Sequence, residues 1–330
     1  MKKLKMLILA LVMATLAVIP SACGKETVTI WTSTEEYNIE FMQKKLGERF
    51  PDYNIQIVYD STSNIATKII NEGENSECDL VFQEEYAYLE NMISKGVLDS
   101  IEGDYDLSKY EPDTITDELK NYVLPNIRSG GAIIINNYVL EQHGLEKPTS
   151  YNDLLNSAYR GLVSMASPKS SGTGYMFYYS LVKAWEEEPA LTYFNNLAPN
   201  VLQFTTSGSG PVNALVNREV AVGFGMISQA VNKINGGNTE LEILFFEEGA
   251  PFNLYGNAIV KGKKARKAVK DVMDYMDSYL TDASSKEYYP EPVIKGADYE
   301  VQNFPKNINY ANMEGNTYSK KADLLAKWTH

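Results

Sequence analysis

Short apolar stretches alternate with longer amphipathic stretches along most of the chain. The first apolar stretch, 28–31, is rich in β-branched and aromatic residues, which predicts a β-strand. In the stretch 37–50, apolar residues recur every three or four positions, which predicts a helix with one buried face. A second strand is predicted at 55–59, where apolar and polar residues alternate.

The same alternation continues toward the C-terminus. Further strands are predicted at 79–82, 132–135, 161–165, 201–204, 220–224 and 241–246. Further helices are predicted at 65–71, 86–94, 138–143, 151–158, 175–185 and 212–217. Strands that alternate with helices of this length are typical of mainly parallel sheets flanked by helices. The sequence therefore predicts the α/β class, with two lobes built around such sheets.

The first 23 residues have a different pattern. A cationic start is followed by an apolar run at 6–19, and small residues then lead to Cys23. This is typical of a secretory signal peptide, predicted at 1–22, whose apolar run is too short for a permanent membrane span. The boundary resembles the lipobox of bacterial lipoproteins, although Pro20 stands where that motif usually has Leu. We expect lipidation of Cys23, with an ordinary cleaved signal as the alternative.

Composition excludes several classes of function. The chain has 330 residues, enough for two domains, and a net charge of −13, which repels nucleic acid. Only two histidines are present, His143 before a predicted helix-ending glycine and His330 at the C-terminus, and Cys78 is the only cysteine besides Cys23. Ser-His-Asp and Cys-His arrangements and His/Cys zinc sites are therefore poorly supported. We expect a protein that is not an enzyme and has no cofactor or resident metal.

A mechanism based on carboxylates alone stays open. Acidic residues occur in pairs at 35–36, 84–85 and 247–248, although such pairs are also typical of solvated surface.

Hydroxyl-rich and glycine-rich segments follow four of the predicted strands and precede helices. These segments lie at 32–35, 61–64, 167–174 and 205–210. Such junctions place hydroxyls and unpaired backbone N–H groups at helix N-termini, where an anion is favoured, and in open α/β sheets ligands bind at these strand ends. The segment 167–174 is the most specific, since it combines a lysine, four hydroxyl residues and two glycines. It is not a Walker loop, because it lacks the Gly-Lys-Ser/Thr tripeptide.

Ten segments, taken in their order along the chain, resemble the extracellular solute-binding proteins of ABC importers. The resemblance is to the class that contains ferric-ion, aminoalkylphosphonate, hexose-phosphate, thiamine and polyamine binders. It is carried by 28–35, 78–88, 130–136, 148–155, 159–161, 170–175, 207–212, 219–225, 248–251 and 256–262.

The resemblance implies a type II periplasmic-binding-protein-like fold with the ligand in the cleft between two lobes. The lobes would be 27–130 plus 247–280 and 131–246, joined by crossing segments near 126–135 and 246–255, with the tail 281–330 on either lobe. Closure on binding, delivery to the membrane permease, a monomeric state and an extracytoplasmic, lipid-anchored location are further implications.

The resemblance also implies a set of ligand-binding residues. These are Ser33, Thr34 and Glu35 after the first strand, Glu84 and Tyr86 after the third, Ser170, Ser171, Gly172 and Thr173 as an anion-binding loop, Ser207 and Ser209 opposite it, and Met226. Met226 lies in the stretch where ferric binders have paired tyrosines, and Phe224 and Met226 offer no hard oxygen ligand for iron. We expect the tyrosine pairs 178–179 and 288–289 to pack within or on the lobes.

The leading hypothesis for the ligand is a small organic anion, a phosphonate or a phosphate ester such as an aminoalkylphosphonate or a sugar phosphate. A carboxylate such as Glu35 or Glu84 would then receive an amine or hydroxyl at its far end. A ferric ion is the second hypothesis, and a polyamine or thiamine is the third. A scaffold or adhesion lipoprotein has no sequence repeat to support it.

Overall fold

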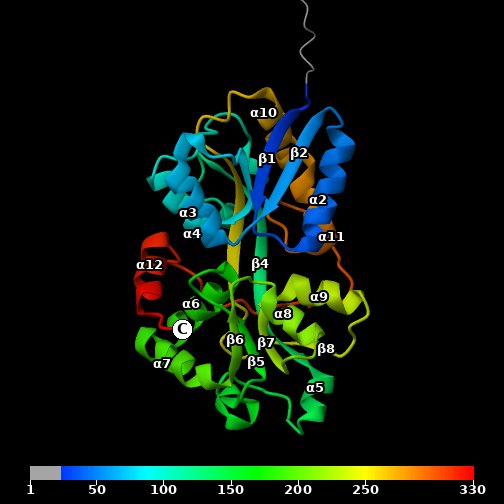
Figure 1. Cartoon of the computed structure of the whole chain (residues 1–330), viewed down its shortest axis with the longest axis vertical. Helices are drawn as coiled ribbons and strands as arrows, with labels where there is room; N and C mark the ends of the chain where they lie inside the picture. The colour runs from blue at the N-terminus through cyan, green and yellow to red at the C-terminus, as the bar shows by residue number, and fades with distance from the viewer. Residues whose placement is uncertain (1–23) are drawn as a thin grey trace, which may run out of the picture.

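The first half of the chain folds into strand–helix units, as predicted. The computed structural model describes residues 24–330, so the predicted signal peptide and Cys23 lie outside it. The elements are β1 (Glu26–Thr32), α2 (Glu36–Arg49), β2 (Tyr53–Tyr59), α3 (Thr62–Glu72), β3 (Leu80–Glu85) and α4 (Tyr86–Ser94). Strand β1 pairs in parallel with both β2 and β3, and the helices flank this sheet in the upper half of Figure 1.

Two long strands connect the two halves of the molecule. They are β4 (Val123–Asn136) and β9 (Phe252–Ile259), and they pair antiparallel from Val123 to Gly130 of β4. From Gly131 onward, β4 instead pairs with strands of the lower half. A Cβ on Gly131 would lie 2.5 Å from Cε of Met176, so the strand changes partner at a residue where only glycine fits without a shift.

The second half contains a second sheet with strand order β4-β7-β5-β6, and β8 pairs with β4. Its elements are α5 (Asn137–Gln142), β5 (Val163–Ala166), α6 (Gly172–Trp185), α7 (Glu187–Leu197), β6 (Val201–Thr205), α8 (Gly210–Val216), β7 (Val222–Met226), α9 (Ile227–Asn235) and β8 (Leu241–Leu244). Strand β5 is parallel to β6 and β7, whereas β4 is antiparallel to β7 and β8. This half lies below the first in Figure 1.

The secondary structure differs from the sequence prediction at several places, among them strand β9, which was not predicted. The helix predicted at 151–158 is two short 3₁₀ turns, Asn152–Leu155 and Ser157–Tyr159. The carboxylate of Asp153 accepts backbone N–H bonds from Thr149 and Ser150, and such local bonds compete with a helix. The prediction also lacked helices α7 and α9. Helix α7 follows directly on α6, and the chain reverses at Glu186 with φ of 71°.

The C-terminal part of the chain contacts both halves. It forms α10 (Lys267–Tyr275), a π-helical turn (Met276–Leu280), α11 (Thr281–Tyr288) and α12 (Tyr318–Lys327). Helices α10 and α11 pack on the upper half, against β1 and α2 respectively. Helix α12 packs against α4, while Trp328 packs in the lower core with its ring centroid 5.1 Å from that of Tyr178 and 5.2 Å from that of Phe194.

Buried apolar side chains fill both halves. In the upper half, Val28 and Ile30 of β1 pack with Met42 and Leu46 of α2, which is the face that the sequence periodicity predicts. Tyr178 and Tyr179 are buried in the lower core, as expected for packing residues. Within 24–330, no helix is long and apolar enough to cross a membrane. The lobe boundaries inferred from the sequence stay a prediction.

Candidate functional site

A cavity of about 670 Å³ lies where the two halves meet. Its walls come from the N-terminal ends of α2, α3, α6 and α8, from one side of α9, and from the connecting strands β4 and β9. Helix N-termini leave backbone N–H groups without helical partners, and their dipoles favour negative charge. The cavity is therefore surrounded by hydrogen-bond donors from both halves.

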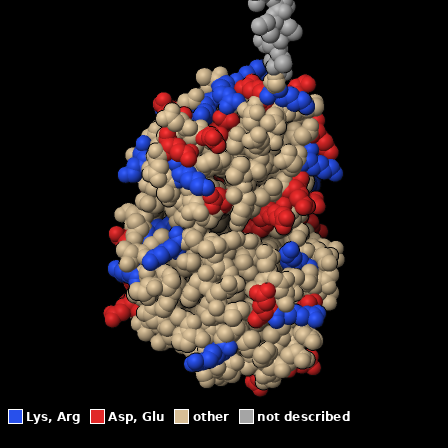
Figure 2. Space-filling model, viewed as in Figure 1, with Lys and Arg blue, Asp and Glu red and all other residues tan. Residues whose placement is uncertain are grey.

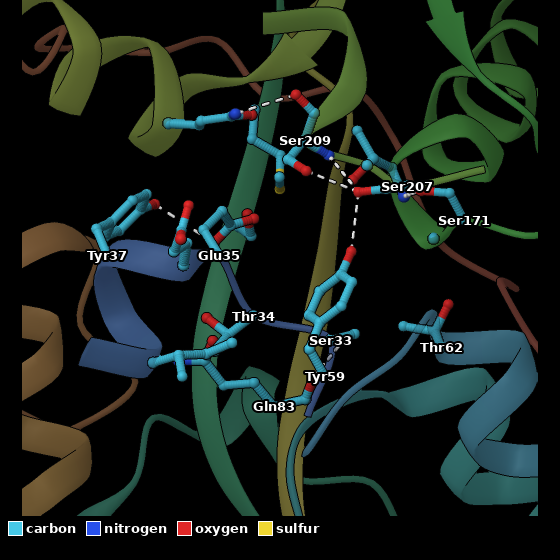
Figure 3. Close-up of a pocket in the computed structure, with 18 of the residues that line it drawn as sticks. Ser33, Thr34, Glu35, Tyr37, Tyr59, Thr62, Gln83, Ser171, Ser207 and Ser209 are labelled. Atoms are coloured by element: carbon cyan, nitrogen blue, oxygen red, sulfur yellow. Dashed lines mark hydrogen bonds between the residues drawn. The ribbon is translucent and has the colours of Figure 1, made fainter. Parts of the chain in front are cut away.

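Nine of the residues that the sequence assigned to the site line this cavity. They are Ser33, Thr34, Glu35, Ser171, Gly172, Thr173, Ser207, Ser209 and Met226. Figure 3 shows Tyr37 and Glu35 on one side of the space, and Ser171, Ser207 and Ser209 on another.

The other three predicted residues, Glu84, Tyr86 and Ser170, do not line this cavity. Strand β3 has a bulge in which Gln83 adopts a positive φ of 53°, so Gln83 faces the cavity instead of Glu84. The hydroxyl of Tyr86 donates to the carbonyl of Thr114 at 2.7 Å, and Ser170 Oγ donates to the carbonyl of Thr206 at 3.0 Å. Glu84 is 1% exposed, and neither carboxylate oxygen has a hydrogen-bond partner in the described part of the chain.

Several polar wall residues were not predicted. Tyr59 ends β2, Gln83 lies in the bulge, and Asn213, Gln229 and Lys233 lie on α8 and α9. Helix α9 was absent from the prediction, so its side chains had no expected position. The sequence gives no signal for the bulge that turns Gln83 inward. A regular strand places only one of the two neighbours Gln83 and Glu84 on the cavity face, and the sequence pattern does not say which.

The predicted anion-binding loops of the lower half lie in contact with each other. Ser171 caps α6, and its Oγ accepts the backbone N–H of Thr173 at 3.2 Å. Ser207 Oγ and Ser209 Oγ are 2.7 Å apart. A Cβ on Gly208 would collide with Oγ1 of Thr173, so the absence of a side chain there lets the two loops meet. The result is a compact group of hydroxyls and backbone donors.

The two halves also touch each other at this group. The hydroxyl of Tyr59 lies 2.8 Å from Ser207 Oγ, and Ser63 Oγ donates to the carbonyl of Ser170 at 3.1 Å. Figure 3 shows Tyr59 reaching toward Ser207. A ligand held by the lower hydroxyls would therefore lie within reach of the upper half.

Helix α3 contributes hydroxyls that have no partner among the described residues. Ser61 precedes the helix and Thr62 begins it, and Ser61 Oγ and Thr62 Oγ1 are both buried without a hydrogen bond in 24–330. Both residues line the cavity. Buried hydroxyls are normally paired, so these two are available to a ligand.

Glu35 has a different environment. It is 8% exposed, and its Oε2 accepts hydrogen bonds from Tyr289 at 3.0 Å and from Tyr37 at 3.3 Å. Burial raises the pKa of Glu35, and the hydroxyls of Tyr289 and Tyr37 oppose that rise. The expectation that Tyr289 only packs was wrong, since its hydroxyl holds a carboxylate of the cavity wall.

Gly172 brings the start of α6 against a buried ion pair. A Cβ on Gly172 would lie 2.5 Å from Oε2 of Glu85, the last residue of β3. Lys321 of α12 donates to both oxygens of this carboxylate, at 2.7 and 2.6 Å, and both side chains are fully buried. The ammonium group of Lys321 therefore offsets a negative charge directly behind the anion-binding loop.

The described residues contain no group of three or more His, Cys, Asp and Glu side chains placed to hold a metal ion. Burial and the neighbouring Glu35 carboxylate raise the pKa of both Tyr37 and Tyr289 well above the usual range. These phenols are therefore held in their neutral form.

Comparison with known proteins adds a family and a fold. Residues 76–313 match the family of bacterial extracellular solute-binding proteins. A curated relative from Haemophilus influenzae, described as an uncharacterized protein, is 27% identical over 258 residues, which are 77% of this chain and 74% of that protein.

Solved structures with a similar fold include several periplasmic binding proteins. The periplasmic binding protein P5PA has a TM-score of 0.81 at 21% identity, covering 92% of this chain and 98% of that one. AfuA from Actinobacillus pleuropneumoniae, with exogenous fructose-6-phosphate bound, has a TM-score of 0.81 at 22% identity over the same shares. Iron-bound HitA from Pseudomonas aeruginosa has a TM-score of 0.75 at 17% identity, covering 92% of this chain and all of that one. The predicted type II periplasmic-binding-protein fold is confirmed.

Proposed function

The chain belongs to the bacterial extracellular solute-binding proteins, and we propose that it captures a small organic oxyanion and delivers it to a membrane permease. The family match and the fold support a periplasmic solute-binding component of an ABC importer. The finer assignment, to a phosphonate or phosphate ester, is our own. We further propose that the ligand leaves unchanged, because this task is binding rather than catalysis.

The observation that carries the proposal is the convergence of neutral donors at the lower wall. Ser171, Thr173, Ser207 and Ser209 present hydroxyls beside the N-terminus of α6. Hydrogen bonds to a charged group contribute about 1.5–3 kcal/mol each, so three or four of them suffice for tight binding. A tetrahedral oxyanion has enough acceptor oxygens to use them all.

The upper half offers a second set of donors for the same ligand. The unpartnered hydroxyls of Ser61 and Thr62 belong to the half opposite Ser171. An oxyanion that bonds to both sets gains contacts only when the halves are together. This arrangement supports binding coupled to closure of the cleft.

A ferric ion fits this cavity less well. A ferric site of this kind needs anionic oxygen ligands, but Phe224 and Met226 supply none. The phenols nearest to Glu35 have raised pKa values, which favours the neutral hydroxyl over the phenolate. A polyamine is supported by the acidic wall residues but leaves the lower hydroxyl group without an anion.

We also propose that Cys23 carries a lipid that anchors the protein at the outer face of the cell membrane. Membrane fractionation of a Cys23→Ala variant tests this, because the variant should leave the membrane fraction. If the variant stays in the membrane fraction as the wild type does, the proposal of a lipid anchor is refuted.

A thermal-shift screen tests the ligand class. The panel would contain phosphonates, sugar phosphates, sulfate, thiamine and its phosphates, polyamines and ferric citrate. A ligand at about 1,000 times its Kd adds roughly 4 kcal/mol to the free energy of unfolding. We expect stabilisation by a phosphonate or phosphate ester, whereas a response to ferric citrate or a polyamine alone would contradict the proposal.

A further inference from the structure

The carboxylate of Glu35 lies in the cavity wall without a basic partner. Within 24–330, no Lys, Arg or His side chain lies within ion-pair distance of it, although the side chain is only 8% exposed. Buried carboxylates in proteins are normally paired with a cation, because the unpaired charge is costly to remove from water. The carboxylate of Glu35 is therefore open to a cationic group of a ligand that enters the cavity.

The protein fixes the position of this carboxylate through hydroxyl groups. Tyr289 and Tyr37 both donate to Oε2, at 3.0 and 3.3 Å. Behind them, Thr34 Oγ1 lies 3.3 Å from the Tyr289 hydroxyl and accepts a hydrogen bond from Asn38 at 3.0 Å. Oxygen Oε2 is thus engaged by two phenol groups, which fix the orientation of the carboxylate.

The charges of the cavity wall also favour a cationic partner for Glu35 from the ligand. Its wall includes three carboxylates, on Glu35, Glu36 and Glu40, and one ammonium group, on Lys233, a formal charge of −2. All three carboxylates lie at the start of α2, whereas the residues of the lower hydroxyl loops that line the cavity carry no charge. Figure 2 shows acidic side chains gathered at the edge where the two halves meet.

A doubly charged phosphonate or phosphate ester that has no cationic group would enter a cavity whose wall is also negatively charged. The lower hydroxyls solvate such an anion but do not neutralise it. A hydroxyl on the ligand would donate to the carboxylate of Glu35 and leave its charge uncompensated. A ligand ammonium group would donate to this carboxylate and neutralise the buried charge as well.

We propose that Glu35 is the subsite for a cationic amino group, so that the ligand is a zwitterion with an oxyanion at one end and an ammonium group at the other. This inference rests on the proposed oxyanion site and deepens it. It separates amino-substituted phosphonates and phosphate esters from neutral sugar phosphates, which share the same oxyanion.

Matched probes test the subsite by isothermal titration calorimetry. The probes are 2-aminoethylphosphonate, 2-hydroxyethylphosphonate and ethylphosphonate, with phosphoethanolamine and ethyl phosphate as the ester counterparts. The wild-type protein should bind each amino compound ten- to a hundred-fold more tightly than its alkyl analogue, the range expected for one charged hydrogen bond. The hydroxy compound should bind closer to the alkyl one.

Variants show whether Glu35 causes the preference. Glu35→Gln should bring the amino-to-alkyl affinity ratio close to one while affinity for ethylphosphonate is kept or increased. Tyr289→Phe keeps the carboxylate and should reduce the ratio only in part. Glu48→Gln, an exposed site on the same helix and outside the cavity, is the matched control and should keep the wild-type ratio.

The outcomes separate the two proposals. Equal affinity of the wild-type protein for amino and alkyl probes would overturn the ammonium subsite and leave the oxyanion site standing. An amino preference that survives Glu35→Gln would also overturn it. If none of the probes binds, the ammonium subsite fails, and the oxyanion site fails with it only if no sugar phosphate stabilises the protein in the thermal-shift screen.

Discussion

The buried polar side chains without a hydrogen-bond partner near the cleft are of two kinds, those on residues that line the cavity and those on residues that do not. Ser61 and Thr62 line the cavity and their hydroxyls have no partner in the described chain, whereas Glu84 is equally unpartnered but does not line the cavity. An unsatisfied buried polar group costs about 1–3 kcal/mol. A ligand that hydrogen-bonds to Ser61 and Thr62 offsets this cost, whereas the cost of the unpartnered Glu84 affects only stability.

Thr62→Val tests the first kind, because valine keeps the shape and removes the hydroxyl. The free protein should be as stable as the wild type or slightly more so, since a buried unpaired group is lost. Affinity for the oxyanion should fall roughly ten-fold, as one hydrogen bond to a charge is removed. Thermal unfolding and calorimetry give the two readouts, and lower stability with unchanged affinity would refute the assignment.

Glu84→Gln tests the second kind through pH dependence. Burial, followed by the nearby Glu85 charge, raises the pKa of Glu84 well above its usual range. The folded protein therefore keeps this proton at a pH where the unfolded chain releases it, so stability is lost as the pH rises from the unfolded pKa toward the raised one.

The Glu84→Gln variant should unfold at a higher temperature than the wild type at pH 8 and at nearly the same temperature at pH 5. Ligand affinity should not change, since Glu84 lies outside the cavity wall. A Tm difference of the same size at both pH values would contradict the raised pKa.

At the scale of elements, helix α12 connects the tail to both halves. It packs on α4, its Lys321 pairs with Glu85 at the end of β3, and Trp328 lies in the lower core. Since Glu85 lies against Gly172, the ammonium group of Lys321 stabilises the start of α6 as well as the tail. The tail is therefore part of the support of the site.

Lys321→Met tests this support, because it leaves the buried carboxylate of Glu85 without its cation. Such a loss costs about 3–5 kcal/mol, and affinity for an oxyanion should fall too, since an uncompensated negative charge would lie behind Gly172. Chemical denaturation and calorimetry measure the two effects. The control Lys320→Met removes a partly exposed pair with Glu187 and should cost less than 1 kcal/mol. Similar losses in both variants would argue against the buried pair.

Elements with a clear period were predictable, and those set by tertiary contacts were not. The apolar face of α2 and the hydroxyl segments before α3 and α6 were readable from the sequence, because each depends on a local pattern. The lower loops that line the site followed from the same reasoning. The bulge at Gln83, the inward position of Tyr289 and the pairing of Lys321 depend on residues distant in the chain, and nothing local indicates them.

At the scale of the whole molecule, β4 and β9 connect the halves, and β4 changes partner at Gly131. The tail is a further connection, since it pairs with the upper half at Ile294 and packs on the lower half at Phe304. Two halves joined in this way can move against each other with small changes at the connecting strands. The contacts of Tyr59 with Ser207 and of Ser63 with Ser170 are then made or lost as the cleft closes or opens.

Small-angle X-ray scattering tests this motion. The radius of gyration should be smaller with a saturating zwitterionic or oxyanion ligand than without it, since bonds from both halves to one ligand favour the closed form. Sodium chloride at matched ionic strength is the control. Identical profiles with and without a bound ligand would show that binding does not close the cleft.

Calorimetry of Ser171→Ala and Thr173→Ala against the tightest-binding oxyanion tests the central claim most directly. Each variant should bind ten- to a hundred-fold more weakly than the wild type, while the control Ser157→Ala, at an exposed site outside the cavity, binds normally. Circular dichroism confirms that each variant is folded. Normal binding by both Ser171→Ala and Thr173→Ala, together with loss of binding in Tyr289→Phe, would contradict the oxyanion account and favour a site built on the tyrosines.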